Sequence, residues 1–221
     1  MDLLEAAKAR HAVRAYKAQP IDKAAIDALN EEIGKINAES GLNLQLVLNE
    51  TKAFSGMMAR YGKFKNANNY IAVIGKNDKD LPVKAGYYGE RLVLFAQTLG
   101  LNTCWVAVSY SKVKDAYKIG PGEKLLVVIS IGYGETQGVP HKSKAFGAVC
   151  KEKGNMPEWF INGVNGALTA PTAMNQQKFS FSLNEGKVKL KAGTGFYTKL
   201  DAGIVKYHFE LAAGKENFEW A

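Results

Sequence analysis

Two hydrophobic periodicities alternate along this sequence and restrict what it can fold into. Residues 82–99 carry apolar side chains at helical spacing, whereas residues 104–108 and 125–129 form short apolar runs with several β-branched residues. These patterns predict a buried helix followed by two central strands. Helices and strands that share one core define an α/β or α+β protein, so an all-helical bundle and a β-sandwich do not fit.

Capping and turn residues predict further elements around this core. Helices are expected at residues 2–10, 22–40, 111–117, 160–167 and about 200–213, and strands at 44–48, 70–74, 179–183 and 187–191. Residues 53–69 form a polar stretch that we expect to be mobile. Residues 132–156 lack periodicity and are interpreted as a long connection, of a length that often carries function.

The composition limits the class of protein. With 221 residues, 47% of them hydrophobic, the chain can bury a core without disulfides or metals. Its longest apolar stretch, 125–131 with Ser130 interrupting, is far shorter than the roughly 20 residues that span a bilayer. Its start is acidic and lacks the features of a secretory signal. We therefore expect a cytoplasmic protein without membrane contact. The net charge of +8 either steers an anion towards the chain or keeps it soluble.

No metal site or covalent nucleophile is predicted. His11, His141 and His208 share no metal-ligand spacing with each other or with the two cysteines. His208 lies on the apolar side of the last predicted helix and is interpreted as a core histidine. Cys104, inside an apolar strand, is interpreted as packing. The sequence shows no Ser-His-Asp or Cys-His pattern that would indicate nucleophilic catalysis.

A faint internal repeat is present. Residues 42–50 resemble residues 174–185, each after a predicted helix, and Ala85-Gly86 and Ala202-Gly203 each begin a helix that runs to a tryptophan, Trp105 or Trp220. Coincidence is the alternative. If the repeat is real, the chain is an incomplete duplication folded as a single domain over residues 1–221, with a first half-repeat of about 1–150, a shortened second of about 155–221, and a pseudo-twofold between them.

Three short motifs are candidates for ligand binding. Arg10-His11-Ala12-Val13-Arg14 can hold a phosphate, because guanidinium groups make bidentate contacts to phosphate oxygens, although a solvated surface is the alternative. Lys142-Ser143-Lys144 adds positive charge, or is a solvated loop. Residues 170–177 combine small residues and amides that let backbone approach a planar ligand, or form an ordinary turn.

Together these motifs resemble the nitroreductase family of flavoproteins. The opening 10–16, followed by Pro20-Ile21, is similar to the family's Arg-Arg-Ser-Val-Arg-x-Phe and Pro-Val/Ile. The family's Gly-Leu-Gly-x-Cys-Trp-Val strand is similar to Gly100-Leu101-Asn102-Thr103-Cys104-Trp105-Val106. The likeness to its Ala-Pro-Ser-x-x-Asn-x-Gln-Pro-Trp motif stands near the C-terminus, at 170–177, instead of soon after the arginines. This order resembles the Thermotoga-like branch with a shortened internal duplication. Ala12 replaces a phosphate-binding Ser, and Lys144 replaces Arg.

The resemblance implies a nitroreductase-like fold, with a central mixed, mostly antiparallel sheet flanked by helices, and a site for FMN. The implied cofactor-binding residues are Arg10, His11, Ala12, Arg14, Cys104, Trp105, Val106, Lys142, Lys144, Pro171, Thr172, Ala173, Asn175 and Gln177. NADPH or NADH would deliver hydride to flavin N5, and a small acceptor such as a nitroaromatic or quinone would take it up in a ping-pong scheme. The chemistry then belongs to the cofactor, and no protein group is predicted to be catalytic.

Other functions remain open at this point. A flavin-binding protein, or a non-redox flavin enzyme of the same fold, would also carry these altered motifs. A nucleic-acid binder is supported only by the net charge, since the basic residues are spread along the chain without a recognised motif, and we expect no nucleic-acid partner. The sequence leaves the choice between NADH and NADPH undecided, as well as that between monomer and homodimer.

Overall fold

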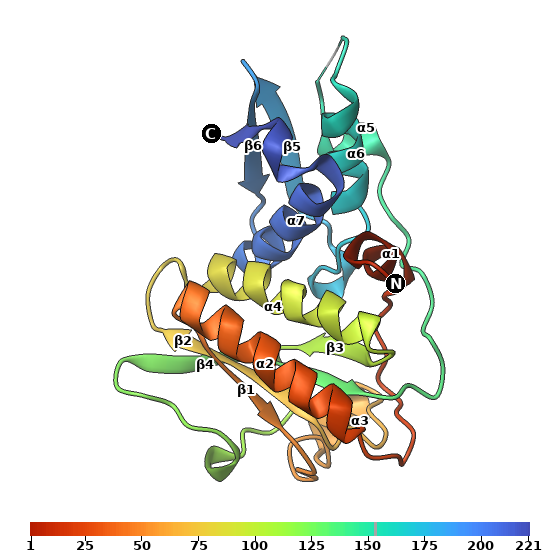
Figure 1. Ribbon diagram of the computed structural model, residues 1–221, viewed down its shortest axis with the longest axis vertical. Helices are drawn as coiled ribbons and strands as arrows, with labels where there is room; N and C mark the ends of the chain where they lie inside the picture. Colours follow the sequence, from red (N-terminus) through yellow and green to blue (C-terminus); the bar gives the residue numbers. More distant parts are fainter. Residues whose placement is uncertain (153) are drawn as a thin grey trace. The chain divides into compact units, whose positions relative to one another are not determined.

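The computed structural model describes residues 1–152 and 154–221 (Figure 1). The chain divides into two compact units. We call residues 9–81 and 92–139 the sheet unit, and residues 1–8, 82–91 and 140–221 the hairpin unit. A single domain built from two half-repeats stays a prediction.

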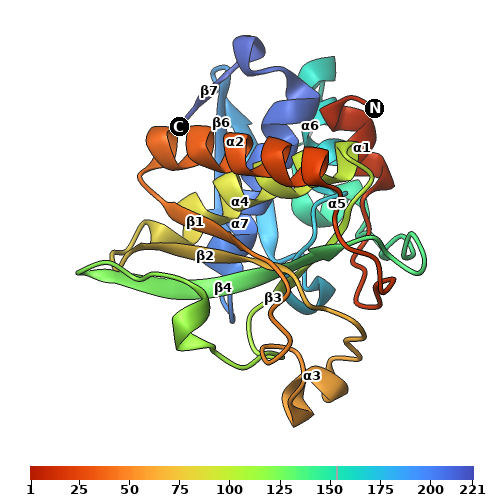
Figure 2. The same cartoon turned by 60° about the horizontal axis from the view of Figure 1, so that its bottom comes forward.

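The sheet unit contains four antiparallel strands in the order β1-β2-β4-β3 (Figure 2). They are β1 (Asn43–Val47), β2 (Tyr70–Lys76), β3 (Asn102–Val106) and β4 (Glu123–Gly132). β2 and β4 are paired along most of their length and are mostly buried, as their continuous apolar sequences predict. The prediction that β3 is a central strand is wrong, because β3 ends the sheet. Its apolar sequence is explained by a parallel bridge from Ala12 to Thr103, which brings another segment against its free edge.

Helix ends in the structure follow the capping signals. Before α1 (Leu3–Ala9), Asp2 and Glu5 form a capping box, in which each backbone N–H donates to the other carboxylate, at 2.8 and 3.0 Å. α2 (Lys23–Ser40) packs on β1 and ends at Gly41, whose φ of 67° is the left-handed conformation that glycine adopts without strain. α4 (Leu81–Thr98) contributes residues 82–91 to the hairpin unit and its remainder to the sheet unit.

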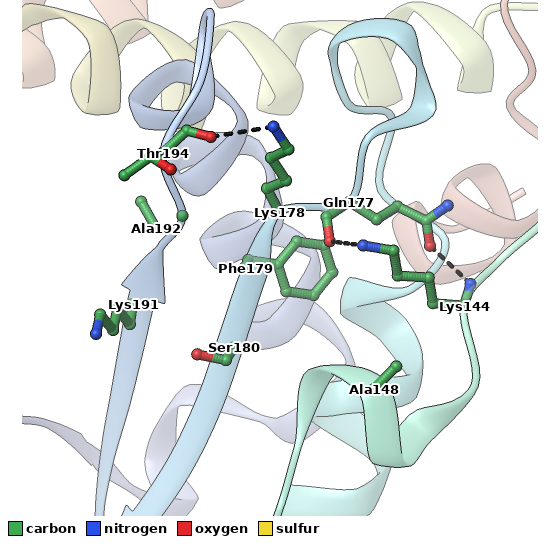
Figure 3. A pocket seen from close by; sticks show the side chains of 10 residues that line it. Lys144, Ala148, Gln177, Lys178, Phe179, Ser180, Lys191, Ala192 and Thr194 are labelled. Atoms are coloured by element: carbon green, nitrogen blue, oxygen red, sulfur yellow. Dashed lines mark hydrogen bonds between the residues drawn. The ribbon is translucent and has the colours of Figure 1, made fainter.

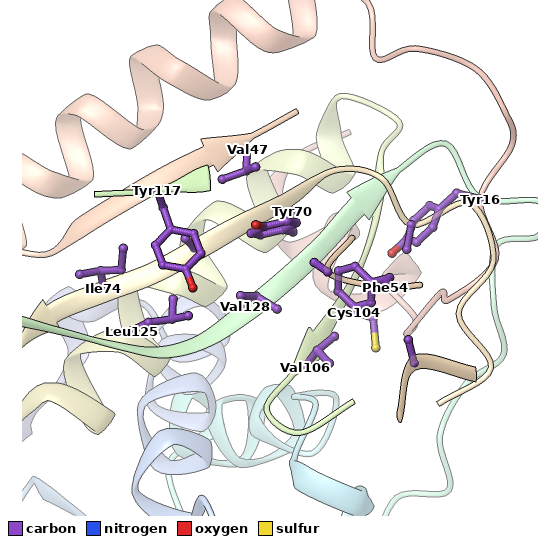
Figure 4. Close-up of a cluster of buried hydrophobic side chains, with 14 of the residues drawn as sticks. Tyr16, Val47, Phe54, Tyr70, Ile74, Cys104, Val106, Tyr117, Leu125 and Val128 are labelled. Atoms are coloured by element: carbon purple, nitrogen blue, oxygen red, sulfur yellow. The ribbon is translucent and has the colours of Figure 1, made fainter. Parts of the chain in front are cut away.

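Aromatic side chains form much of the core of the sheet unit (Figure 4). Phe54 lies 4.7 Å from Phe64 and 6.1 Å from Tyr70, measured between ring centroids. Phe54 and Phe64 come from the polar stretch 53–69, which also contains the short helix α3 (Met57–Tyr61). The stretch is therefore anchored by its aromatic residues, although Met57 and Tyr61 of α3 are exposed.

The hairpin unit contains a helical pair and a small sheet. Its elements are α5 (Phe146–Val149), α6 (Glu158–Ala167), β5 (Phe179–Asn184), β6 (Lys187–Ala192), α7 (Thr198–Ala213) and β7 (Glu219–Trp220). β5 and β6 form the predicted antiparallel hairpin, and β7 joins β6 in parallel. Phe209 of α7 stacks on Phe181 of β5 at 4.8 Å and meets Phe160 of α6 at 6.0 Å, so one aromatic core joins sheet and helices.

Two glycines allow α4 and α7 to touch within the hairpin unit. A Cβ on Gly86 would overlap the carbonyl oxygen of Leu200, three residues before Gly203, and a Cβ on Gly203 would overlap that of Val83, three residues before Gly86. Each Cβ would also meet the backbone nitrogen one residue beyond the opposing glycine, at 3.0 and 2.7 Å. The contacts are thus reciprocal, as a local twofold relation between the two helices requires. They involve the same Ala-Gly pairs that indicate the internal repeat.

Several predicted boundaries need correction. The helix expected at 111–117 is only a 3₁₀ turn, Lys114–Ala116. The helices that start near Ala85 and Ala202 do not reach Trp105 and Trp220, since they end at Thr98 and Ala213 and both tryptophans lie in strands. The connection at 132–156 contains the one-turn helix α5. Nonetheless, the α/β class with mostly antiparallel pairing is confirmed. No helix in the described ranges has both the length and the apolar character needed to cross a membrane.

Candidate functional site

The arginine motif lies in an extended segment against β3 of the sheet unit. The N–H of Val13 donates to the carbonyl of Thr103 at 3.1 Å, and that of Lys65 donates to the carbonyl of Arg14 at 3.0 Å. Residues 10–16 therefore run between β3 and the loop after α3 as an additional short strand. Such a segment alternates its side chains, which places Val13 in the core and leaves Ala12 and Arg14 exposed.

Arg10 and Arg14 both act on the same thiol. Burial raises the pKa of Cys104, whereas the nearby guanidinium groups of Arg14 and Arg10 lower it. Arg10 is only 4% exposed, and Arg14 is open to solvent. Two positive charges therefore lie next to β3. Guanidinium groups in this arrangement suit an oxyanion such as a phosphate.

Several residues outside the predicted cofactor-binding set hold the arginine segment in place. The Tyr16 hydroxyl lies 2.7 Å from both the Val13 carbonyl oxygen and Ser130 Oγ. Asn102 accepts the N–H of Gly134 at 3.0 Å through its side chain, and Gly134 in turn forms a β-bridge with Tyr16. Gly138, at φ 73°, packs so closely that a Cβ there would lie 2.8 Å from the His11 Cβ. Only glycine meets both the positive φ and the close approach at this position.

The other predicted residues of the sheet unit differ in what they can offer a ligand. Cys104 and Val106 are buried, and both belong to the aromatic core (Figure 4). Trp105 projects from the opposite face of the strand and is half-buried, as is His11. A ligand beside β3 would therefore meet the backbone of Cys104 and Val106 rather than their side chains.

The second set of predicted residues surrounds a loop of the hairpin unit. Gln177, which is 2% exposed, accepts the N–H of Lys144 at 2.8 Å and donates through Nε2 to the Lys142 carbonyl at 2.9 Å and to Asn175 Oδ1 at 2.8 Å. Asn175 donates to the same Lys142 carbonyl at 3.0 Å. These two amides fasten loop 142–144 to loop 172–177. Both Nε2 donors of Gln177 and its carbonyl oxygen thereby have partners within the chain.

The same loop has an unusual backbone. Met174, Asn175 and Gln177 have φ of 50°, 53° and 45°, the left-handed region that residues with a side chain adopt at a cost. Thr172 contributes by accepting the Gln177 N–H on its hydroxyl at 3.0 Å. Pro171, Thr172 and Ala173 are partly exposed beside these turns. Their peptide groups are therefore held in a fixed conformation near the surface.

Asp201, on α7, anchors this loop and was not found from the sequence. Its Oδ1 accepts the N–H of Ala173 at 2.9 Å, and its Oδ2 accepts Nε2 of Gln176 at 2.7 Å. Burial raises the pKa of Asp201, and these two hydrogen bonds offset part of the rise. Asp201 lies 28 residues from Ala173 in sequence, so local spacing gave no signal for the contact.

His208 is a buried histidine with partners on both ring nitrogens. Its Nε2 lies 2.9 Å from Glu90 Oε1, and its Nδ1 lies 3.0 Å from Thr169 Oγ1. The Thr169 hydroxyl also donates to the Gly166 carbonyl at 2.7 Å. The prediction of a core histidine with satisfied partners is confirmed. Cys104 and Cys150 are buried free thiols, and the described residues contain no cluster of acidic, histidine and cysteine side chains able to hold a metal.

The predicted site residues thus form two sets, one in each unit. Arg10, His11, Ala12, Arg14 and residues 104–106 meet at the edge of β3. Lys142, Lys144 and residues 171–177 are joined by the amides of Asn175 and Gln177. Each set is ordered by contacts within its own unit.

Comparisons with known proteins give the family. Residues 2–213 match the family described as "Putative TM nitroreductase". The fold resembles that of a "putative nitroreductase" from Thermotoga maritima, with a TM-score of 0.72, 21% identity, and coverage of 98% of this chain and 85% of that one.

Two further solved structures resemble parts of the chain, both with a TM-score of 0.53. A "putative NADH dehydrogenase/NAD(P)H nitroreductase" from Parabacteroides distasonis is 23% identical and covers 66% of this chain and 95% of its own. A "putative nitroreductase in complex with FMN" from Desulfovibrio desulfuricans is 15% identical and covers 71% and 99%. No curated protein matches the chain. Because the family match extends from residue 2 to residue 213, across both sets of predicted residues, this chain belongs to the nitroreductase family.

Proposed function

We propose that this chain is an FMN-dependent oxidoreductase, which passes hydride from NADH or NADPH through flavin N5 to a small electron acceptor such as a nitroaromatic or a quinone. The observation that carries the proposal is the segment with Arg10 and Arg14, which pairs with β3 next to Cys104 in a member of this family. The FMN complex of the Desulfovibrio protein and the name of the Parabacteroides protein support the cofactor and the donor, respectively.

The residues of the sheet unit fit the phosphate end of FMN. Two guanidinium groups supply charge-assisted hydrogen bonds, and the exposed Ala12 between them leaves room for an anion. Ala12 lacks the hydroxyl that the family pattern has here, so the arginines and backbone N–H groups must bind the phosphate without it. Tyr16, Asn102 and Gly138 keep the segment fixed, which lowers the entropy lost on binding.

The hairpin-unit residues are proposed to contact FMN mainly through backbone. Asn175 and Gln177 use their amides to hold loop 142–144, so we assign them positioning roles. Pro171, Thr172 and Ala173 are partly exposed and are proposed to contact the flavin, although the Ala173 N–H already donates to Asp201. Lys142 has an exposed side chain that can add positive charge. The Lys144 ammonium donates to two backbone carbonyls, which leaves one of its three N–H donors for an anion.

Bound FMN would supply the two-electron hydride chemistry. The chain would bind and orient the reactants and would contribute no nucleophile. This division fits the burial of Cys104, whose raised pKa keeps its sulfur as an unreactive thiol at neutral pH. It also fits the position of His208 inside a helical core, with both ring nitrogens occupied.

The visible absorption spectrum of the purified protein tests the cofactor, and anaerobic stopped-flow mixing with NADH or NADPH tests the reaction. We expect a flavin absorption band that is bleached by at least one donor and restored by a quinone or nitroaromatic. Bound FMN that neither donor bleaches would overturn the reductase and favour a flavin-binding protein. A chain that binds no FMN would overturn the whole proposal.

A further inference from the structure

A depression in the hairpin unit lies beside the strands rather than at the arginine motif. It has a volume of about 400 Å³ and is bounded by β5, the end of β6 and the segment around α5 (Figure 3). Lys144, Lys178 and Lys191 line it, and none of the described lining residues is acidic. We call it the lysine depression. Only Lys144 and Gln177 of its lining are among the residues predicted to bind FMN.

Two of the ammonium groups in the lysine depression donate hydrogen bonds to backbone carbonyls. Lys144 donates to the carbonyl oxygens of Gln176 and Gln177 at 2.9 and 2.8 Å, and Lys178 donates to that of Thr194 at 3.1 Å. Carbonyl oxygens are neutral, so these hydrogen bonds hold the lysines without cancelling their charge. An electropositive hollow attracts anions, most strongly at low ionic strength.

The same hydrogen bonds prepare the lysines for a ligand. An ammonium group has three N–H donors. Lys144 has two of them on carbonyls and Lys178 has one, so both retain donors for a further acceptor. Because the side chains are already held in one conformation, less rotamer entropy is lost when an anion binds.

The walls of the depression combine apolar and polar surface. The ring of Phe179 lies on the side of β5 that faces Lys144 and Ala148, and the hydroxyl of Ser180 lies on the side of Lys191 (Figure 3). Gly193 passes so close to β5 that a Cβ would lie 3.0 Å from the Lys178 carbonyl oxygen. The volume is within the range of about 300–1,000 Å³ that is typical of small-molecule sites.

We propose that the lysine depression binds a small molecule with two phosphate groups, of the diphosphate-ester class, as a ligand separate from FMN. The three lysines come from three different segments: Lys144 from the segment before α5, Lys178 from the position just before β5 and Lys191 from the end of β6. Their ammonium groups point to different sides (Figure 3). A ligand with two anionic groups can therefore contact more of them than a ligand with one. Lysine acts as a point charge towards phosphate and needs no bidentate geometry.

Isothermal titration calorimetry of the full chain, saturated with FMN, tests this site. The probes are pyrophosphate and ADP, with AMP as the single-phosphate comparison and adenosine as the uncharged control. We expect one saturable site per chain for pyrophosphate and ADP, weaker binding of AMP and none of adenosine. Added salt should weaken binding of both diphosphates.

Variants locate the binding. Lys178→Gln and Lys191→Gln should each raise the dissociation constant of pyrophosphate about fivefold. Lys189→Gln also removes an exposed charge from the same strand as Lys191 but outside the depression, and should leave the dissociation constant of pyrophosphate unchanged.

The proposal is overturned if neither diphosphate binds saturably, or if the three variants have the same dissociation constant for pyrophosphate. It is also overturned if FMN displaces the probe, because the probe then occupied the cofactor phosphate site. A chain that binds no FMN is titrated as purified, so the two proposals fail separately.

Discussion

At the scale of single residues, the roles of some side chains in the candidate site can be predicted from the sequence and those of others cannot. Arg10 and Arg14 are recognisable, because two arginines four residues apart stand in a family motif. Asp201 and Gln176 are not, since they act through a contact between segments far apart in sequence. The same holds for the Lys144 ammonium, whose carbonyl partners are known only once the chain is folded.

Arg14 gives a direct test of the cofactor site. Arg14→Gln removes an exposed guanidinium group and should weaken FMN binding about 10- to 100-fold, the range for a lost hydrogen bond to a charged group. Lys17→Gln removes an exposed positive charge from the same segment and should have little effect. Titration of each folded variant with FMN, followed by flavin fluorescence, measures both. Equal affinities of wild type and Arg14→Gln would refute the assignment of Arg14.

Asp201 gives a prediction for pH. Because burial raises the pKa of Asp201 in the folded state, its contribution to stability is fully present below the unfolded pKa of about 3.9 and is lost as pH rises through the higher folded value. The difference in unfolding free energy, wild type minus Asp201→Asn, should therefore fall as pH rises from about 4. Urea denaturation of both proteins at several pH values measures it. A difference that grows with pH contradicts the predicted sign.

The buried pair of His208 and Glu90 gives a prediction for stability. Their relative exposures are 1% and 0%, and their side chains approach to 2.9 Å. His208→Leu should lower the unfolding free energy by about 3 kcal/mol, because a buried carboxylate loses its imidazole partner. Glu90→Leu with His208→Leu should cost less than the sum of the single changes. Additive losses in urea denaturation would show that the two side chains are not coupled.

At the scale of elements, the sequence predicts most helices and strands of both units, and the exceptions have physical reasons. Residues 111–117 carry helical spacing but pack as a 3₁₀ turn. After α7, Gly214 takes a φ of 76°, and the chain turns back so that β7 can pair with β6. A two-residue strand that pairs in parallel depends on its partner, and periodicity alone cannot reveal it.

The crossing of α4 and α7 gives a sharp element-scale prediction. Gly203→Ala should lower the unfolding free energy by about 3 kcal/mol, because its methyl group would overlap the backbone of α4 and overpacking is costly. Gly34→Ala is the matched control: Gly34 is exposed within α2, and a Cβ there meets nothing within 4 Å. Alanine should stabilise α2 by up to about 1 kcal/mol. Similar effects of the two substitutions would contradict a backbone contact at Gly203.

At the scale of the whole molecule, parts of the net charge of +8 are assigned to two different proposed ligands. Arg10 and Arg14 of the sheet unit are assigned to one phosphate, and the lysine depression of the hairpin unit is assigned to a second anion. These are compact sites for small ligands. A nucleic-acid duplex would instead need a continuous basic surface, and none of the site geometry described requires one.

The reciprocal contacts of Gly86 and Gly203 support the internal repeat, and the repeat predicts how the chain binds its cofactor. If one chain contains both half-repeats, it supplies both sets of site residues, and a second copy is not needed. We therefore expect one FMN per chain, with a dissociation constant that stays the same when the chain concentration is raised a hundredfold. Fluorescence titrations at two chain concentrations, with light scattering on the same samples, measure affinity and assembly together. An affinity that increases with chain concentration, in step with dimer formation, would show that a partner chain completes the site.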